Sequence, residues 1–195
     1  MRFNRTTVAR ARRPALAGRW WVALLTLVAA CHGPSILCAQ DALQREYEIK
    51  AAFLYNFIRY IDFPAETTAA ANGTLTIGII GDPPVGSVFD PLNNKQIKGC
   101  KLVVKEHASA KDLSGCQIIF ICASEKDRLP EILGELKDSH ALTVSEIDGF
   151  AARGGIINFI SERNKVRFEI NPDAAHRLGF AISSDLLKLA KLVKA

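Results

Sequence analysis

The segment from Glu46 to Ile61 constrains the fold most, because read as a helix it is apolar on nearly every side. One apolar stripe, whose members are three or four positions apart, is formed by Ile49, Phe53, Phe57 and Tyr60. A second stripe is formed by Ala51, Leu54, Tyr55, Ile58 and Ile61. A helix that is apolar all round is covered on both sides.

Two interpretations of this helix remain open. It is a central core helix, or one stripe packs on its own domain while the other binds a second protein, with Leu54, Ile58 and Ile61 as the partner-binding candidates. Glu46 and Lys50 are spaced for an ion pair along the helix. At about 1.5 Å per residue the helix would be about 24 Å long. It is too short and too charged for a membrane span, which needs about 20 apolar residues.

The first 39 residues are typical of a secretory signal peptide. Six arginines and no acidic residue occur there, and an apolar run from Trp20 to Ala30 follows the arginines. The sequence therefore predicts a signal peptide over 1–39 and a domain over 40–195, with cleavage after Ala39. A lipobox ending in Cys31 is the competing cleavage site, and a retained membrane anchor is a further alternative.

The charge of the predicted domain argues against a nucleic-acid partner, although the whole chain has a pI near 9.0. Of 25 basic residues, six lie in 1–39, which leaves 19 against 20 acidic residues and a net charge of −1. Such a domain has no excess of positive charge to neutralise phosphates.

Three cysteines, Cys100, Cys116 and Cys122, remain after cleavage at Ala39. Cys116 and Cys122 flank one predicted strand and would lie about 20 Å apart, which is beyond the reach of a disulfide. Cys100 and Cys116 both precede strands, so they are the disulfide candidate if those strands are neighbours. A third strand between them would exclude the bond.

Strand and helix patterns alternate along the rest of the chain and predict an α/β fold. Apolar runs predict buried parallel strands at 74–81, 102–104, 117–121 and 141–144. Helices are expected at 85–92 and 125–137, the latter capped by Ser124. A hairpin of 156–160 and 166–170 and two terminal helices follow. The predicted architecture is a three-layer sandwich with a mostly parallel central sheet, a C-terminal β-hairpin and terminal helices.

The sequence contains no motif that predicts catalysis. The phosphate-loop lysine and the hydrolase serine motif are missing, and no cysteine or histidine cluster has metal-ligand spacing. We therefore expect no enzyme, no cofactor and no metal site. Asp82 and Ser145 follow or end strands at the carboxyl edge of the sheet, where ligands bind in α/β proteins, and are the ligand candidates.

Four segments in order resemble the YfiR/HmsC family of periplasmic regulators. They are YEIKAAFLYNFIRYIDFP, IGIIGDPP, GCQIIFICASE and the tail from ALTVSEIDGF to SSDLLKLA. The similar region covers about Glu46 to Leu192, and the tail is its most specific part.

The resemblance implies a non-enzymatic repressor. Such proteins bind the periplasmic sensory domain of an inner-membrane diguanylate cyclase and hold it inactive, which lowers cyclic di-GMP and restrains biofilm formation. An outer-membrane OmpA-like lipoprotein sequesters the repressor, and members tend to form homodimers with structural disulfides. The alternative function, from another class, is a periplasmic small-molecule binding module that uses the edge near Asp82 and Ser145.

Overall fold

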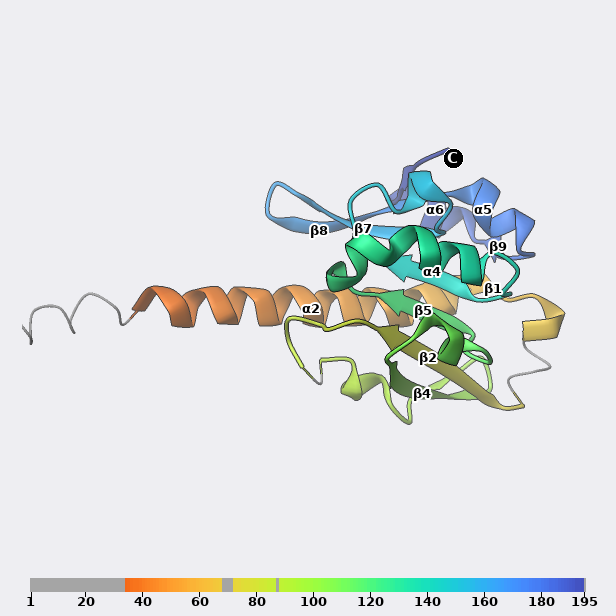
Figure 1. Ribbon diagram of the computed structural model, residues 1–195, viewed down its shortest axis with the longest axis horizontal. Helices are drawn as coiled ribbons and strands as arrows, with labels where there is room; N and C mark the ends of the chain where they lie inside the picture. The colour runs from red at the N-terminus through yellow and green to blue at the C-terminus, as the bar shows by residue number, and fades with distance from the viewer. Residues whose placement is uncertain (1–33, 68–71, 87, 195) are drawn as a thin grey trace, which may run out of the picture. The chain divides into compact units, whose positions relative to one another are not determined.

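A sheet of eight strands, in the order β10-β8-β7-β6-β5-β2-β4-β3, forms the centre of the domain (Figure 1). Its strands are β2 (Thr74–Ile80), β3 (Gln96–Ile97), β4 (Cys100–His107), β5 (Ile118–Ile121), β6 (Leu142–Ser145), β7 (Ile157–Glu162), β8 (Lys165–Ile170) and β10 (Lys191–Leu192). Neighbouring strands are parallel except in the β3–β4 and β7–β8 pairs. The predicted mostly parallel sheet is therefore confirmed.

The computed structural model describes residues 34–67, 72–86 and 88–194. The chain divides into two units, Met1–Asp41 and Ala42–Ala195, and the second contains the whole sheet. Cys31 and most of the predicted signal peptide lie outside the described residues. The predicted cleavage site after Ala39 falls within helix α2 (Pro34–Tyr60), which begins earlier than the sequence pattern indicated.

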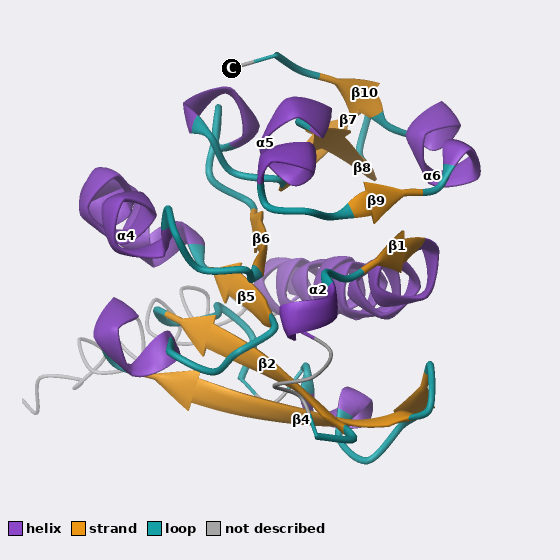
Figure 2. Ribbon diagram, turned by 90° about the vertical axis from the view of Figure 1, so that its right-hand side faces the viewer, coloured by secondary structure: helices purple, strands orange, loops and turns teal. Residues whose placement is uncertain are grey.

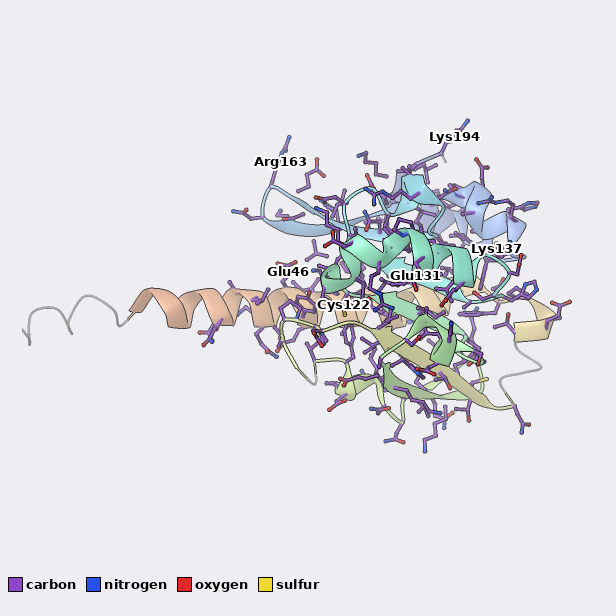
Figure 3. All side chains as sticks on the ribbon, in the orientation of Figure 1. Glu46, Cys122, Glu131, Lys137, Arg163 and Lys194 are labelled. Carbon is purple, nitrogen blue, oxygen red and sulfur yellow. The ribbon has the colours of Figure 1, made fainter. Side chains whose placement is uncertain are left out.

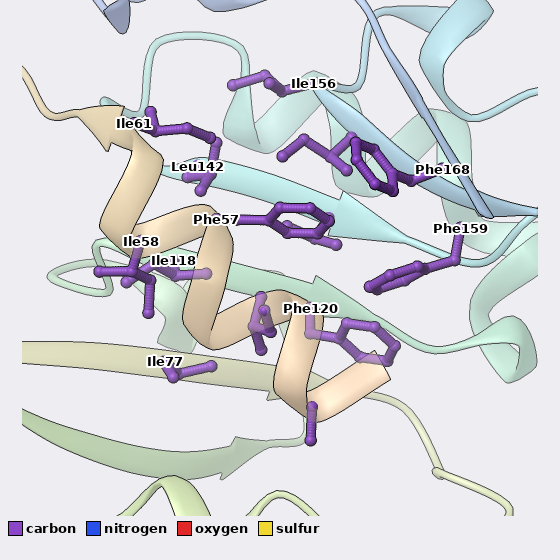
Figure 4. Close-up of a cluster of buried hydrophobic side chains, with 14 of the residues drawn as sticks. Phe57, Ile58, Ile61, Ile77, Ile118, Phe120, Leu142, Ile156, Phe159 and Phe168 are labelled. Atoms are coloured by element: carbon purple, nitrogen blue, oxygen red, sulfur yellow. The ribbon is translucent and has the colours of Figure 1, made fainter. Parts of the chain in front are cut away.

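Helix α2 covers one face of the sheet and supplies much of the larger core (Figure 4). Phe57 is fully buried, and its ring centroid lies 5.6 Å from that of Phe159 and 5.0 Å from that of Phe168. Side chains of β2, β5 and β6 pack beneath the helix; among them are Ile77, Ile118, Phe120 and Leu142. The apolar pattern of α2 thus creates the core on which the domain is built.

A second, smaller core covers the opposite face of the sheet. The side chains that cover it come from η2 (Ala110–Leu113), from α4 (Leu129–Leu136), and from Ile147 and Phe150. Two further 3-10 segments, η3 (Ala123–Arg128) and η4 (Ala151–Arg153), precede α4 and follow Phe150. Gly78 lets η2 approach, since a Cβ there would lie 2.8 Å from Cys116 Sγ and 2.8 Å from a methyl of Leu113. Helical layers on both faces confirm the three-layer sandwich (Figure 2).

Two predicted helices are shorter in the structure than in the sequence pattern. Of the helix predicted at 85–92, the structure has only the single 3-10 turn η1 (Asp90–Leu92). The second begins as the 3-10 segment η3 and becomes α-helical only at Leu129, because Pro130 has no N–H to bond the carbonyl of Lys126. Ser124 does not cap it as predicted, and its Oγ accepts a hydrogen bond from Asp82 N–H at 2.9 Å.

The C-terminal elements follow the prediction closely. The β7–β8 hairpin turns at Arg163 and Asn164, both with positive φ, as tight two-residue hairpins require. Asn171 caps α5 (Pro172–Arg177) by accepting from Ala174 N–H at 2.9 Å. The two terminal helices are α5 and α6 (Ser184–Leu189).

A separate pair of short strands joins the two ends of the domain. Strand β1 (Ile61–Asp62) runs antiparallel to β9 (Ala181–Ile182). It follows α2 directly, and Ser183 N–H donates to the carbonyl oxygen of Tyr60 at 3.0 Å. The end of α2 is thus fixed by residues more than a hundred positions later in the chain.

Candidate functional site

Three side chains form a buried polar cluster at the carboxyl edge of the sheet. Glu146, just after β6, accepts hydrogen bonds from Tyr47 Oη at 2.5 Å and from Lys50 Nζ at 2.6 Å. The backbone N–H of Ala123 also donates to Glu146, at 3.2 Å. Lys50 forms the predicted pair with Glu46, at 2.6 Å. The cluster therefore fixes α2 to the loops after β5 and β6.

The surroundings of this cluster keep neighbouring acidic groups protonated. Burial, followed by the hydrogen bond to Glu146, raises the pKa of the Tyr47 phenol well above its ordinary value of 10.0. Burial and then the negative charge of Glu146 raise the pKa of the Cys122 thiol to about 12. Tyr47 is therefore a neutral donor at pH 7, and Cys122 is an unreactive thiol rather than a nucleophile.

Ser145, a predicted ligand residue, is structural. Its side chain is fully buried. Its Oγ donates to the carbonyl oxygen of Ile121 at 2.8 Å and accepts from Ile147 N–H at 3.1 Å. A buried hydroxyl that already donates one hydrogen bond and accepts another is not available to bind a ligand, so this part of the prediction was wrong.

The edge beside Asp82 is closed by the protein itself. The chain adds β4 on one side of β2 and then β5 and β6 on the other, so the order of strand addition reverses between β2 and β5. Doubly wound sheets have a ligand crevice at this position. Here the segment after β5 fills that position, since a Cβ on Gly81 would lie 2.4 Å from Ser124 Oγ and 2.8 Å from Glu125 Cγ. The Asp82 side chain is exposed outside this contact, and its role as a ligand residue stays a prediction.

The predicted partner-binding stripe is part of the core. Leu54, Ile58 and Ile61 are each 0% exposed, so the folded domain presents none of them to a partner. The prediction failed because the stripe that contains Leu54, Ile58 and Ile61 packs into the core of the domain itself, whereas Ile49 and Tyr60, at the ends of the other stripe, are the exposed apolar residues of α2. The core interpretation of this helix is the correct one.

Other apolar side chains are exposed, and the sequence pattern did not single them out as a surface. Among the described residues the large ones are Ile49, Tyr60, Leu189 and Leu192, which are 46%, 41%, 67% and 56% exposed. The last two belong to α6 and β10, and β10 is an edge strand of the main sheet. An exposed edge with apolar neighbours is a typical docking surface.

The predicted Cys100–Cys116 disulfide does not form. Cys100 begins β4 and Cys116 precedes β5, and β2 lies between these two strands. Two strand spacings amount to about 9.6 Å, beyond the Cα separation of about 7 Å that a disulfide tolerates. The two side chains also contribute to different cores on opposite faces of the sheet. Cys100, Cys116 and Cys122 are all free thiols.

Across residues 34–67, 72–86 and 88–194, no three or more His, Cys, Asp or Glu side chains are grouped so that they could bind a metal ion. Within the same ranges, no helix combines the length and apolar character that crossing a membrane requires.

The fold is an α/β sandwich of the doubly wound type in which the position between β2 and β5 is filled by the segment after β5. Residues 47–191 match the family described as YfiR/HmsC-like, and the chain belongs to that family of periplasmic regulators. The comparison with curated proteins gives no match.

Solved structures with partial similarity include two that align with 61% of this chain. One, titled as an ABC domain in complex with L-Trp from Streptococcus pneumonia, has 12% identity and a TM-score of 0.46. The other, a conserved domain protein from Vibrio cholerae O1 biovar El Tor, has 14% identity and a TM-score of 0.47. The aligned part spans about half of their length, 55% and 54% respectively.

Proposed function

We propose that this chain is an exported periplasmic regulator, released from its signal peptide, that binds the sensory domain of an inner-membrane diguanylate cyclase. By holding the cyclase inactive it lowers cyclic di-GMP and restrains biofilm formation. The observation that carries this proposal is the family match over residues 47–191. An OmpA-like outer-membrane lipoprotein that sequesters the regulator, and a homodimeric state, belong to the same proposal.

The sheet edge supports a binding role over a catalytic one. Tyr47 and Lys50 both donate hydrogen bonds to Glu146, and Ser145 bonds to the backbone. These four side chains are thus engaged in holding α2 and the strand ends together. A regulator needs only to bind the inactive state of its partner better than the active state.

The surface proposed for the cyclase is the exposed apolar segment of α6 and β10, marked by Leu189 and Leu192. We propose this surface in place of Leu54, Ile58 and Ile61 of α2, which the sequence suggested as partner-binding residues and which are buried. A large exposed leucine costs little folding free energy to replace, whereas its burial against a partner contributes about 2 kcal/mol.

Cross-linking in the native cell envelope, followed by mass spectrometry of the captured proteins, tests the function. We expect the tagged protein to capture an inner-membrane protein with a periplasmic domain and a cytoplasmic cyclase domain. Deleting the captured cyclase should abolish the change in cyclic di-GMP that loss of the regulator causes. Capture of self-cross-links alone, with unchanged cyclic di-GMP in a deletion strain, would contradict the proposal.

A further inference from the structure

A groove of about 460 Å³ lies between α4, η4 and α5, away from the carboxyl edge described above. Thr143 of β6 also lines it, and Figure 2 shows α4 to the left of β6 and α5 above it. This volume is in the range of small-molecule sites, about 300 to 1,000 Å³.

The rim of this groove is positively charged. Lys137 at the end of α4, Arg153 at the end of η4 and Arg177 at the end of α5 all line it. All three side chains are exposed. The only acidic residue lining the groove is Asp138. Three elements distant in sequence therefore direct cationic residues to one concave surface.

The two arginines of the rim have no partners within the described chain. Neither Arg153 nor Arg177 forms a side-chain hydrogen bond or ion pair with residues 34–67, 72–86 or 88–194. Lys137 approaches Asp138 at only 3.9 Å, and both side chains are more than 70% exposed, so this pair adds little. By contrast, Arg128, at the end of η3, is paired with Glu125 at 3.1 Å.

The overall charge of the domain makes this concentration informative. Residues 40–195 carry 19 basic and 20 acidic residues. An excess of basic residues therefore does not explain why unpaired cations gather at this groove. Like charges on one rim repel one another, and an anion between them would remove that repulsion. Guanidinium groups are the side chains best suited to carboxylate and phosphate oxygens.

The groove also has apolar surface. Leu133 and Leu136 of α4 contribute to it, as do Ala174 and Leu178 of the α5 segment. His140 also lines the groove, and its Nδ1 donates to the carbonyl oxygen of Leu178 at 3.4 Å. Apolar side chains beside unpaired cationic ones suit a ligand that carries an oxyanion on a small apolar frame.

We propose that the groove between α4, η4 and α5 binds a small organic anion, a carboxylate or phosphate on an apolar frame, through Arg153 and Arg177. This site goes beyond the proposed regulatory function and does not depend on it. It would supply the regulator with an effector site separate from the α6–β10 surface.

Isothermal titration calorimetry on the purified protein tests the site with phenyl phosphate, benzoate and the neutral benzyl alcohol. We expect at least one anion to bind, more weakly as salt is added, and benzyl alcohol not to bind. Arg153→Gln and Arg177→Gln should each raise its Kd about tenfold, the loss of one charge-assisted contact. Both side chains are exposed, so both variants should fold as the wild type does.

Arg163→Gln is the matched control, because Arg163 lies at the β7–β8 turn, well away from Lys137 (Figure 3). Its Kd should equal that of the wild type. Binding of phenyl phosphate alone or benzoate alone identifies the preferred oxyanion. Failure of both anions to bind at millimolar concentration, or equal weakening by Arg163→Gln, would overturn the proposal. Cyclase capture by Arg153→Gln and Arg177→Gln is measured separately, so failure of this site leaves the proposed function standing.

Discussion

Lys50 Nζ lies 2.6 Å from Glu146 Oε2, and each of these side chains is only 7% exposed. The pair joins helix α2 to the loop after β6, across 96 positions of sequence. Because Glu146 also accepts from Tyr47 and Ala123, its carboxylate is satisfied without water. The helix is therefore held against the sheet edge by one acidic residue as well as by apolar packing.

Glu146→Gln should lower the free energy of unfolding by about 3 kcal/mol, because it leaves the buried Lys50 ammonium without its buried partner. Urea denaturation measures the change. The double variant Lys50→Met with Glu146→Gln should recover part of the loss, since no unpaired charge then remains.

Glu131→Gln is the control for this pair. Glu131 lies 3.8 Å from Arg128, and the two side chains are 63% and 46% exposed. Removing such a pair should change stability by less than about 1 kcal/mol. Equal losses from Glu146→Gln and Glu131→Gln would show that the buried cluster contributes nothing special.

Alkaline pH should destabilise the domain. The pKa of the Cys122 thiol is raised from 9.0 to about 12, and the pKa of the Tyr47 phenol is raised above 10.0. The folded state retains protons that the unfolded chain releases, so the stability is complete below pH 9 and declines as the pH rises toward 12. The slope is up to about 1.4 kcal/mol per pH unit for each group.

Urea midpoints measured across this pH interval test the prediction. Cys122→Ala should flatten the curve from pH 9 upward, and Tyr47→Phe should flatten it above pH 10. An unchanged slope in both variants would mean that other groups cause the alkaline loss of stability.

Ile58→Asp should prevent folding. Ile58 is 0% exposed between α2 and the sheet, and an unpaired carboxylate there is costly enough to exceed the stability of an ordinary domain. Ile49→Asp on the same helix is the matched control, because Ile49 is 46% exposed. Soluble expression and circular dichroism distinguish the two; a folded Ile58→Asp protein would contradict the assigned core.

Leu189→Asp should retain the fold and weaken capture of the membrane partner. Leu189 is 67% exposed, so its replacement costs little stability, and a carboxylate in an apolar interface opposes binding. Cross-linking yield relative to wild type is the readout, with thermal unfolding as the check on folding. Undiminished capture would exclude this part of α6 from the interface.

Peptide mapping of the unreduced protein should show Cys100, Cys116 and Cys122 as thiols with no intramolecular link between the first two. Native-state alkylation should modify Cys100 first, because it is partly exposed and the other two are buried. A Cys100–Cys116 peptide would require the β4-β2-β5 order to be wrong.

The fold was predictable where local pattern and global packing agree. The apolar run of β5 and the alternation in β8 have one reading each, and Asn171 followed by Pro172 indicates a helix start unambiguously. The prediction of a helix over 125–137 was wrong in its first turns, where the structure has η3. A proline can begin an α-helix or interrupt one, and residue spacing alone does not distinguish the two cases.

The site was less predictable because its contacts are long-range. Glu46 with Lys50 could be read from a four-residue spacing, but the approach of Glu146 depends on how α2 lies across the sheet. The same holds for α2 itself, whose two apolar stripes are equally consistent with a core and with an interface. The groove arginines gave no signal, since each is an isolated basic residue in the sequence.

The β1–β9 pair has a consequence for how this chain is made. Ile61 pairs with Ile182, so a chain that emerges N-terminus first cannot close this contact until nearly all of it has appeared. The ring contacts of Phe57 with Phe159 and Phe168 likewise cannot form until those residues have emerged. Contacts of such separation slow folding, because the intervening loop must be ordered first. A polypeptide threaded through a translocon would thus stay unfolded, and transportable, until its last strands arrive.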